Sequence, residues 1–141
     1  MAEIRLLNLA HSYSRTPTGA ADYAIREMNH VWEQGGAYAL LGPSGCGKST
    51  LLNIISGLLS PSHGEVQFDG KVVNALAPEQ RNIAQVFQFP VVYDTMTVFD
   101  NLAFPLRNQG MNEAKVLAKV NEIAEVLELH PLLRKRASNL T

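Results

Sequence analysis

Short apolar stretches separated by turn residues occupy the first 90 positions of the chain. Apolar runs of this length, bounded by Gly, Pro, Asn and Asp, are typical of β-strands. The pair Asp69-Gly70 lies between two such runs and predicts a hairpin turn. The predicted strands cover residues 4–9, 24–33, 37–41, 65–69, 71–73 and 82–87.

Two longer stretches have the spacing of helices. Residues 49–59 are apolar on nearly every side, which predicts a helix buried against a sheet. Gly57 lies near the end of this predicted helix, and Pro61 stops it. Residues 112–129 repeat apolar positions every three or four residues, after Asn112 as a candidate N-cap. We expect this apolar face to pack into a core; a partner-binding face is the alternative. Its members are Leu117, Val120, Ile123, Ala124 and Leu127.

A weaker helical signal begins at Thr97. Thr97 and Asp100 have the spacing of a capping box, with Asp in place of Glu, and a plain loop is the alternative. Pro105 is expected to interrupt the helix that starts there, because proline lacks the backbone N–H and clashes with the preceding turn.

The segment between the predicted strand 37–41 and the predicted helix 49–59 reads GPSGCGKST. It fits G-x-x-x-x-G-K-[ST], the pattern of a phosphate-binding loop, and that motif needs a strand before it and a helix after it. A chance glycine turn is the alternative, and the flanking elements disfavour it. The candidate nucleotide-binding residues are Gly42, Pro43, Ser44, Gly45, Cys46, Gly47, Lys48, Ser49 and Thr50.

The residue types in this loop suit phosphate chemistry. The glycines permit backbone angles that turn N–H groups inward, and the start of the helix directs its positive dipole end at negative charge. We expect Lys48 to reach the β- and γ-phosphates and Ser49 to ligate Mg²⁺. Thr50 is expected to hydrogen-bond a phosphate oxygen nearer the sugar. Cys46 is interpreted as a tolerated small residue, although a reactive thiol is conceivable beside Lys48.

Composition narrows the possible classes. A chain of 141 residues, 46% hydrophobic and 18% charged, has the size and character of one globular domain. Its net charge of −1 gives no electrostatic reason to expect nucleic acid. One cysteine excludes an internal disulfide, and the four histidines lack metal-ligand spacing. Without an apolar run of membrane-spanning length or a signal peptide, we expect a cytosolic protein, with peripheral attachment to membrane proteins left open.

Two residues outside the loop are further candidates. Tyr13 follows the first predicted strand, where an exposed aromatic ring can stack on a base; a packing tyrosine is the alternative. Gln88 follows the predicted strand 82–87. At the carboxyl edge of a parallel sheet a glutamine can orient water and reach Mg²⁺, and a polar loop residue is the alternative.

The order of these features resembles the ATPase subunit of an ABC transporter. The resemblance rests on Tyr13, on GPSGCGKST, on RNIAQVFQ at 81–88 and on TVFDNLAFPL at 97–106, and it covers essentially the whole chain. The last segment is most similar to importer ATPases for carbohydrates and polyols. The implied fold is an α/β P-loop NTPase-type nucleotide-binding domain, of which this chain holds the N-terminal part: an antiparallel β subdomain, the phosphate-loop strand and helix, and the start of a helical subdomain.

The resemblance also implies roles. Residues 1–90 correspond to the core with the phosphate loop, and residues 91–141 to the start of the helical subdomain that docks on the membrane permease subunits. Tyr13 takes the adenine-stacking A-loop role, residues 42–50 are the Walker A loop, and Gln88 takes the Q-loop role on Mg²⁺ and the attacking water. The implied ligands are ATP and Mg²⁺. A second ATPase subunit is an implied partner, and the implied location is the inner face of the cell membrane.

The family's signature motif would begin at about Leu140, and its Walker B carboxylate, catalytic glutamate and switch histidine do not occur in the sequence. We therefore expect the N-terminal part of a longer polypeptide, with an incomplete sheet and negligible ATP hydrolysis on its own. In this fold class the strands between 37–41 and 83–87 come from later sequence, so we also expect open strand edges and self-association.

Two other functions remain as alternatives. The first is a soluble ABC-type ATPase that acts on nucleic acid or ribosomes, which the importer-like segment 97–106 and the near-zero charge disfavour. The second is another P-loop NTPase, such as a small-molecule kinase. It is disfavoured because the match of Tyr13, Gln88 and the 97–106 segment to the pattern of an ABC transporter ATPase would then be coincidence.

Overall fold

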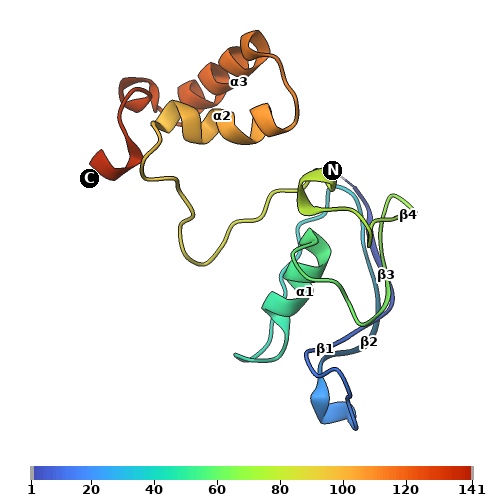
Figure 1. Ribbon diagram of the computed structural model, residues 1–141. Coiled ribbons are helices and arrows are strands. Elements are labelled where there is room, and N and C mark those ends of the chain that lie inside the picture. The colour runs from blue at the N-terminus through green and yellow to red at the C-terminus, as the bar shows by residue number, and fades with distance from the viewer. Residues whose placement is uncertain (1, 141) are drawn as a thin grey trace. The chain divides into compact units, whose positions relative to one another are not determined.

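The computed structural model describes residues 2–140 and divides after Gln85 into two compact units, each described here by itself. The first unit contains one antiparallel sheet with the strand order β2-β1-β3-β4 (Figure 1). Its strands are β1 (Ile4–Ser12), β2 (Tyr23–Trp32), β3 (His63–Phe68) and β4 (Lys71–Val72). These strands confirm four of the six predicted from the apolar pattern.

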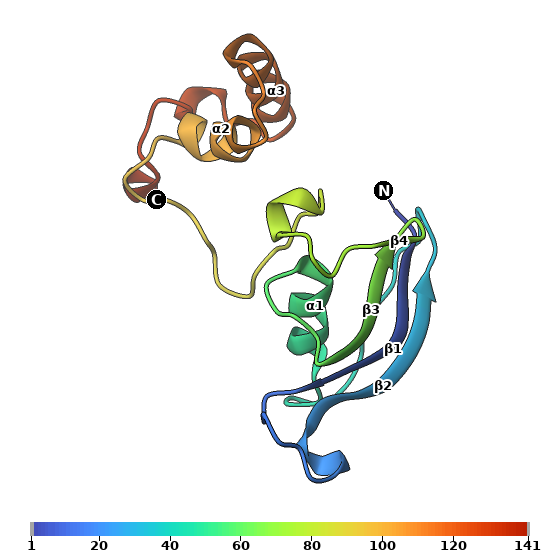
Figure 2. The same cartoon turned by 45° about the vertical axis from the view of Figure 1, so that its right-hand side comes forward.

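Strand β1 lies between β2 and β3 and fixes their register. Ile4 pairs with Trp32 on one side and with Phe68 on the other. The pairing shifts between Leu6 and Leu9, where Asn8 has a positive φ of 49°. Such an irregularity bends a strand and increases its twist, and β1 is curved in Figure 2.

The predicted hairpin turn at Asp69-Gly70 is confirmed. Both residues have positive φ, 49° for Asp69 and 78° for Gly70, which is the requirement of a type I′ turn. The right-handed twist of that turn matches the flanking strands β3 and β4. The turn therefore follows from the local sequence.

The helix α1 (Lys48–Ser56) lies against one face of the sheet (Figure 2). Leu51 and Ile54 are buried there, whereas Leu52 is half exposed. The helix ends at Gly57, whose φ of 86° is the left-handed conformation of a C-cap. The first core consists of Leu6, Leu9, Ile25, Leu51, Ile54, Val66, Phe68 and Val73.

The predicted strands at 37–41 and 82–87 are wrong for this structure. Both segments lack regular secondary structure, and neither pairs with a strand within residues 2–140. A strand exists only where a neighbour accepts and donates its backbone hydrogen bonds, and neither segment pairs with the edge strands β2 and β4. Leu41 is 89% exposed as a result.

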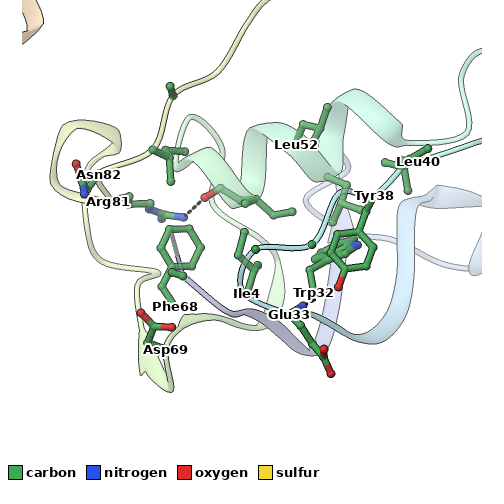
Figure 3. A pocket seen from close by; sticks show the side chains of 18 residues that line it. Ile4, Trp32, Glu33, Tyr38, Leu40, Leu52, Phe68, Asp69, Arg81 and Asn82 are labelled. Atoms are coloured by element: carbon green, nitrogen blue, oxygen red, sulfur yellow. Dashed lines mark hydrogen bonds between the residues drawn. The ribbon is translucent and has the colours of Figure 1, made fainter.

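A cavity of about 740 Å³ opens beside these two segments and the outer face of α1 (Figure 3). Its wall is largely apolar, and none of its lining residues belongs to the phosphate loop. Side chains at its wall include Ile4, Trp32, Tyr38, Leu52, Phe68 and Arg81. The helix is buried against the sheet as predicted, while its opposite apolar side lines this cavity.

The second unit is built on two helices, α2 (Val98–Asn108) and α3 (Glu113–Val126). Both predicted N-caps are confirmed: the Thr97 side chain accepts from the N–H of Asp100 at 3.0 Å, and that of Asn112 accepts from the N–H of Lys115 at 2.9 Å. In place of the reciprocal bond of the predicted capping box, the Asp100 carboxylate accepts from the Thr97 hydroxyl at 2.8 Å. The second core consists of Val98, Ala103, Val116, Val120, Ala124 and Leu133. Short 3₁₀ helices complete the elements: η1 (Ala20–Asp22), η2 (Pro78–Gln80), η3 (His130–Leu132) and η4 (Ala137–Asn139).

Two helical details differ from the prediction. Pro105 lies inside α2 and does not interrupt it, because only one backbone hydrogen bond is lost while the cap and the buried Ala103 hold the helix. In α3 the buried stripe follows a spacing of four residues, through Val116, Val120 and Ala124. Three residues of the predicted core face are largely exposed instead, namely Leu117, Ile123 and Leu127.

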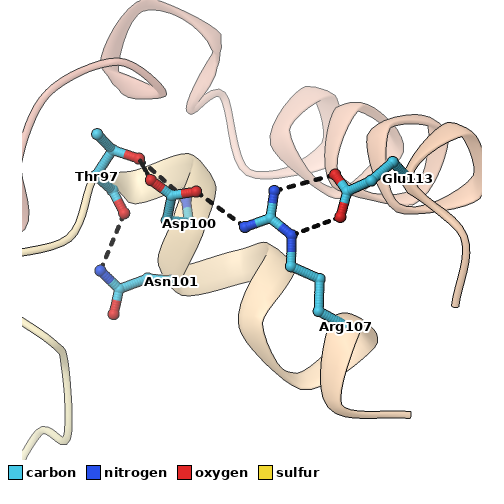
Figure 4. A network of polar contacts seen from close by, with 5 residues as sticks. All are labelled: Thr97, Asp100, Asn101, Arg107 and Glu113. Carbon is cyan, nitrogen blue, oxygen red and sulfur yellow. Dashed lines mark hydrogen bonds and ion pairs between the residues drawn. The ribbon is translucent and has the colours of Figure 1, made fainter. Parts of the chain in front are cut away.

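A charged network joins the ends of α2 and α3 (Figure 4). Arg107 donates to Asp100 at 3.0 Å and to both carboxylate oxygens of Glu113 at 2.8 and 3.1 Å. The pKa of Asp100 is held below its ordinary value mainly by the hydrogen bond from Thr97 and next by that from Arg107. The hydrogen bonds from Arg107 also lower the pKa of Glu113. No helix within residues 2–140 is long and apolar enough to cross a membrane.

Candidate nucleotide-binding site

The phosphate loop of residues 42–50 runs into the first turn of α1. The first backbone hydrogen bond of this helix runs from the N–H of Leu51 to the carbonyl of Gly47, at 2.9 Å. The N–H groups of Lys48, Ser49 and Thr50 consequently have no acceptor among residues 2–140. Unpaired donors at the positive end of a helix dipole form an arrangement that attracts anions.

Two side chains at this helix start fit a metal–phosphate ligand. The Nζ of Lys48 donates to the carbonyls of Gly42 and Pro43 at 2.5 and 2.7 Å, so the ammonium group lies over the first half of the loop. Ser49 is exposed, and its hydroxyl has no hydrogen-bond partner in the described part of the chain. Hydroxyl and phosphate oxygens are ligands that suit Mg²⁺, so these residues fit the predicted ion.

Gly47 shows why the loop needs glycine at its end. Its φ is 95°, and a Cβ atom at this position would lie 2.5 Å from the carbonyl oxygen of Ala24 in β2. Any side chain would therefore strain the backbone and push the helix start away from the sheet. Cys46 is exposed, with its Sγ 3.5 Å from the Nζ of Lys48, and its interpretation as a tolerated small residue stays a prediction.

Tyr13 lies beside the last residue of the phosphate loop, Thr50. It follows the last residue of β1, and its hydroxyl oxygen is 3.0 Å from the Oγ1 of Thr50. Its side chain is 66% exposed, and its ring packs edge-to-face on His11, so the alternative of a packing tyrosine stays open. The ring is accessible to a base, and stacking on adenine stays a prediction.

Gln88 is exposed and belongs to the second unit, whereas the phosphate loop belongs to the first. Its expected contact with Mg²⁺ and water therefore stays a prediction. The neighbouring Gln85 does reach α1, because its amide nitrogen is 3.3 Å from the side-chain oxygen of Asn53. The first unit thus ends at a residue that is hydrogen-bonded to the phosphate-loop helix.

Arg81 holds the other end of this helix and was not identified from the sequence. Its guanidinium is buried and donates to the carbonyls of Ile54 and Ile55 at 2.9 and 3.0 Å, and to that of Leu76 at 3.0 Å. Figure 3 shows the guanidinium pointing at a carbonyl oxygen of α1. Burial lowers the pKa of Arg81 from its ordinary value, and the group stays protonated. An arginine before an apolar run gives no local signal of such a role.

The antiparallel sheet, the phosphate-loop helix and the helical second unit are those of an α/β nucleotide-binding domain of the P-loop type. Residues 25–141 match the family of ABC transporters, and the chain belongs to this family. Its membership confirms the predicted fold class and implies a nucleotide-binding domain.

Two curated relatives show the kind of ABC protein that the chain is similar to. The sn-glycerol-3-phosphate import ATP-binding protein UgpC of Rhodopseudomonas palustris is 42% identical over 141 residues, and the trehalose import ATP-binding protein SugC of Mycobacterium tuberculosis is 44% identical over the same length. Each alignment covers 100% of this chain. The chain spans 38% of the length of the first relative and 35% of the second.

Solved structures support the same fold. A dimeric ATP-binding cassette in a post-hydrolysis state, bound to ADP and Pi, has a TM-score of 0.79 and 28% identity, with 98% of this chain and 63% of that chain covered. A nucleotide-free ATP-binding cassette from an ABC transporter has a TM-score of 0.75 and 27% identity, with 100% of this chain and 60% of that chain covered. Both structures exceed the length of this chain.

Proposed function

We propose that the chain binds MgATP at Gly42–Thr50 and forms the ATP-binding part of an ATPase subunit that powers import of a carbohydrate or polyol. The observation that carries this proposal is the start of α1, where three backbone N–H groups without acceptors adjoin the Lys48 ammonium group and the exposed Ser49 hydroxyl. The importer relatives support the substrate class.

Each loop residue has a role in this proposal. Lys48 exchanges its bonds to the loop carbonyls for bonds to the β- and γ-phosphates, Ser49 ligates Mg²⁺ beside phosphate oxygens and water, and Thr50 donates to a phosphate oxygen nearer the sugar. Tyr13 stacks on adenine. Gln88 contacts Mg²⁺ and positions water in the assembled subunit.

The partners are proposed from the same family. Residues 91–141 form the start of the helical subdomain, and we place the contact with membrane permease subunits there. A second ATPase subunit completes the nucleotide site. This arrangement locates the protein at the inner face of the cell membrane, attached through its partners.

Equilibrium binding of a fluorescent ATP analogue with Mg²⁺ tests the nucleotide site. Lys48→Ala removes charged hydrogen bonds and is expected to weaken binding about tenfold to a hundredfold. Lys71→Ala is the matched control, because Lys71 is exposed on β4, and it should bind as tightly as the natural chain. Equal binding by the Lys48 variant and the natural chain would refute the site. Co-purification with nucleic acid in place of permease subunits would refute the transport role.

A further inference from the structure

The hydroxyl of Tyr13 has a partner that base stacking does not require. Its oxygen lies 3.0 Å from the Oγ1 of Thr50, and this is the only hydrogen bond of the Thr50 hydroxyl within residues 2–140. Thr50 is buried, at 8% exposure, at the third position of α1. An aromatic ring that only stacked on a base would be equally effective without a hydroxyl group.

We propose that the Tyr13 hydroxyl orients Thr50 toward phosphate, and that His11 is a positioning residue that holds the Tyr13 ring in place. The inference rests on the proposed MgATP function and adds a phosphate-side role for Tyr13. A threonine hydroxyl has one proton to donate and two lone pairs to accept with. When the phenol donates to one lone pair, the Thr50 proton stays available for a phosphate oxygen.

The position of the Tyr13 ring is set by His11. The two ring centroids are 4.7 Å apart and the rings are perpendicular, at 89°, which is a favourable edge-to-face arrangement. His11 is buried, at 6% exposure, and its Nδ1 is 3.4 Å from the hydroxyl oxygen of Ser62. The Ser62 hydroxyl also accepts from the backbone N–H of Ser12 at 3.0 Å.

The same histidine has an unused polar atom. Its Nε2 is buried without a hydrogen-bond partner among residues 2–140. A buried polar atom of this kind costs stability. The contact with His11 holds the Tyr13 ring where its hydroxyl reaches Thr50.

Two ligands separate the hydroxyl role from stacking: MgATP, and magnesium tripolyphosphate, which has no base. Tyr13→Phe keeps the ring and removes the hydroxyl, so we expect both ligands to bind about three- to tenfold more weakly, which is the effect of one hydrogen bond. Affinities come from titration of a fluorescent ATP analogue and from its displacement. Tyr93→Phe is the matched control in the second unit and should leave both affinities unchanged.

Thr50 and His11 complete the test. Thr50→Val should weaken both ligands, and adding Tyr13→Phe to it should cause no further loss, because the two hydroxyls act as one unit. His11→Ala should reproduce the loss of Tyr13→Phe, and His11→Phe, which retains a perpendicular ring, should restore binding. If His11→Ala lost binding only because the protein unfolded, His11→Phe would be expected to lose binding as well. Restored binding in His11→Phe therefore separates the positioning role from a general loss of folding.

The outcomes separate the inference from the proposed function. If Tyr13→Phe binds both ligands as the natural chain does, while Tyr13→Ala weakens only MgATP, Tyr13 acts by stacking alone and the inference is overturned. If the natural chain binds neither ligand, or Lys48→Ala has no effect, the proposed function fails and the inference fails with it.

Discussion

Arg81→Met tests how the phosphate-loop helix is held at its far end. The guanidinium makes three hydrogen bonds of 2.9–3.0 Å to the carbonyls of Ile54, Ile55 and Leu76, and a longer one of 3.4 Å to that of Asn74. The first two carbonyls belong to the last turn of α1, where that of Ile54 also accepts from the N–H of Gly57 and that of Ile55 lacks an i+4 helical partner. Methionine fills a similar space and donates nothing.

Two effects of this substitution oppose each other. Methionine avoids the cost of desolvating a buried cation, which in some proteins makes such replacements neutral or favourable. The carbonyls of Ile55 and Leu76, however, remain without donors, while that of Ile54 keeps only the N–H of Gly57 at 3.2 Å. Each unmade bond costs about 1 kcal/mol at the lower end of the known range. With three short bonds lost, we expect the free energy of unfolding to fall by about 3 kcal/mol.

Urea denaturation measures this difference, and Trp32 is a suitable probe because it is the only tryptophan and packs against the first core. With an m-value of about 2 kcal/mol/M, the urea midpoint should fall by about 1.5 M. Arg26→Met is the control, since Arg26 is exposed on β2. Arg81→Lys should give an intermediate value, because one ammonium group cannot span the same carbonyls. A methionine variant as stable as the natural chain would refute the reasoning.

Three further predictions follow from other contacts. Gly57→Ala should destabilise the first unit by at least 1 kcal/mol in the same denaturation assay, because φ is positive there and the new Cβ would lie 2.7 Å from the Nε of Arg81. The depressed pKa values of Asp100 and Glu113 stabilise the second unit above their ordinary values of 3.8 and 4.5, and this stabilisation is lost as the pH falls below them. Arg107→Gln should therefore lower the thermal midpoint at pH 7, and the difference from the natural chain should shrink as the pH falls below these values. Leu41→Lys should reduce concentration-dependent light scattering, since Leu41 is exposed on an unpaired segment; unchanged scattering would exclude this edge as the contact.

Local chemistry made several elements predictable from the sequence. The Asp69-Gly70 turn, the Asn112 cap and the glycine that ends α1 depend on residues within a few positions of each other, and all three occur as predicted. The phosphate loop was predictable for the same reason, because its glycines and lysine act on the adjacent backbone.

Other features depended on distant residues and were not predictable. The segments 37–41 and 82–87 have the composition of strands, but strand formation also requires a neighbouring edge, which sequence periodicity does not report. The role of Arg81 depends on carbonyls 26 and 27 positions earlier in the chain. Tyr13 was identified for its ring, while its hydroxyl bond to Thr50 became evident only from the fold.

The two halves of the phosphate loop are held by different forces. Its second half is fixed by the core of the first unit, because Gly47 lies against β2 and Thr50 is buried beside Tyr13. Its first half follows a segment without strand partners and is held by the bonds from Lys48 to the carbonyls of Gly42 and Pro43. An incoming phosphate must compete for these bonds, so the ammonium group both shapes the loop and binds the ligand. Part of the affinity of Lys48 for phosphate is therefore offset by the release of the loop carbonyls, whereas the N–H groups of Lys48, Ser49 and Thr50 are preorganised for binding.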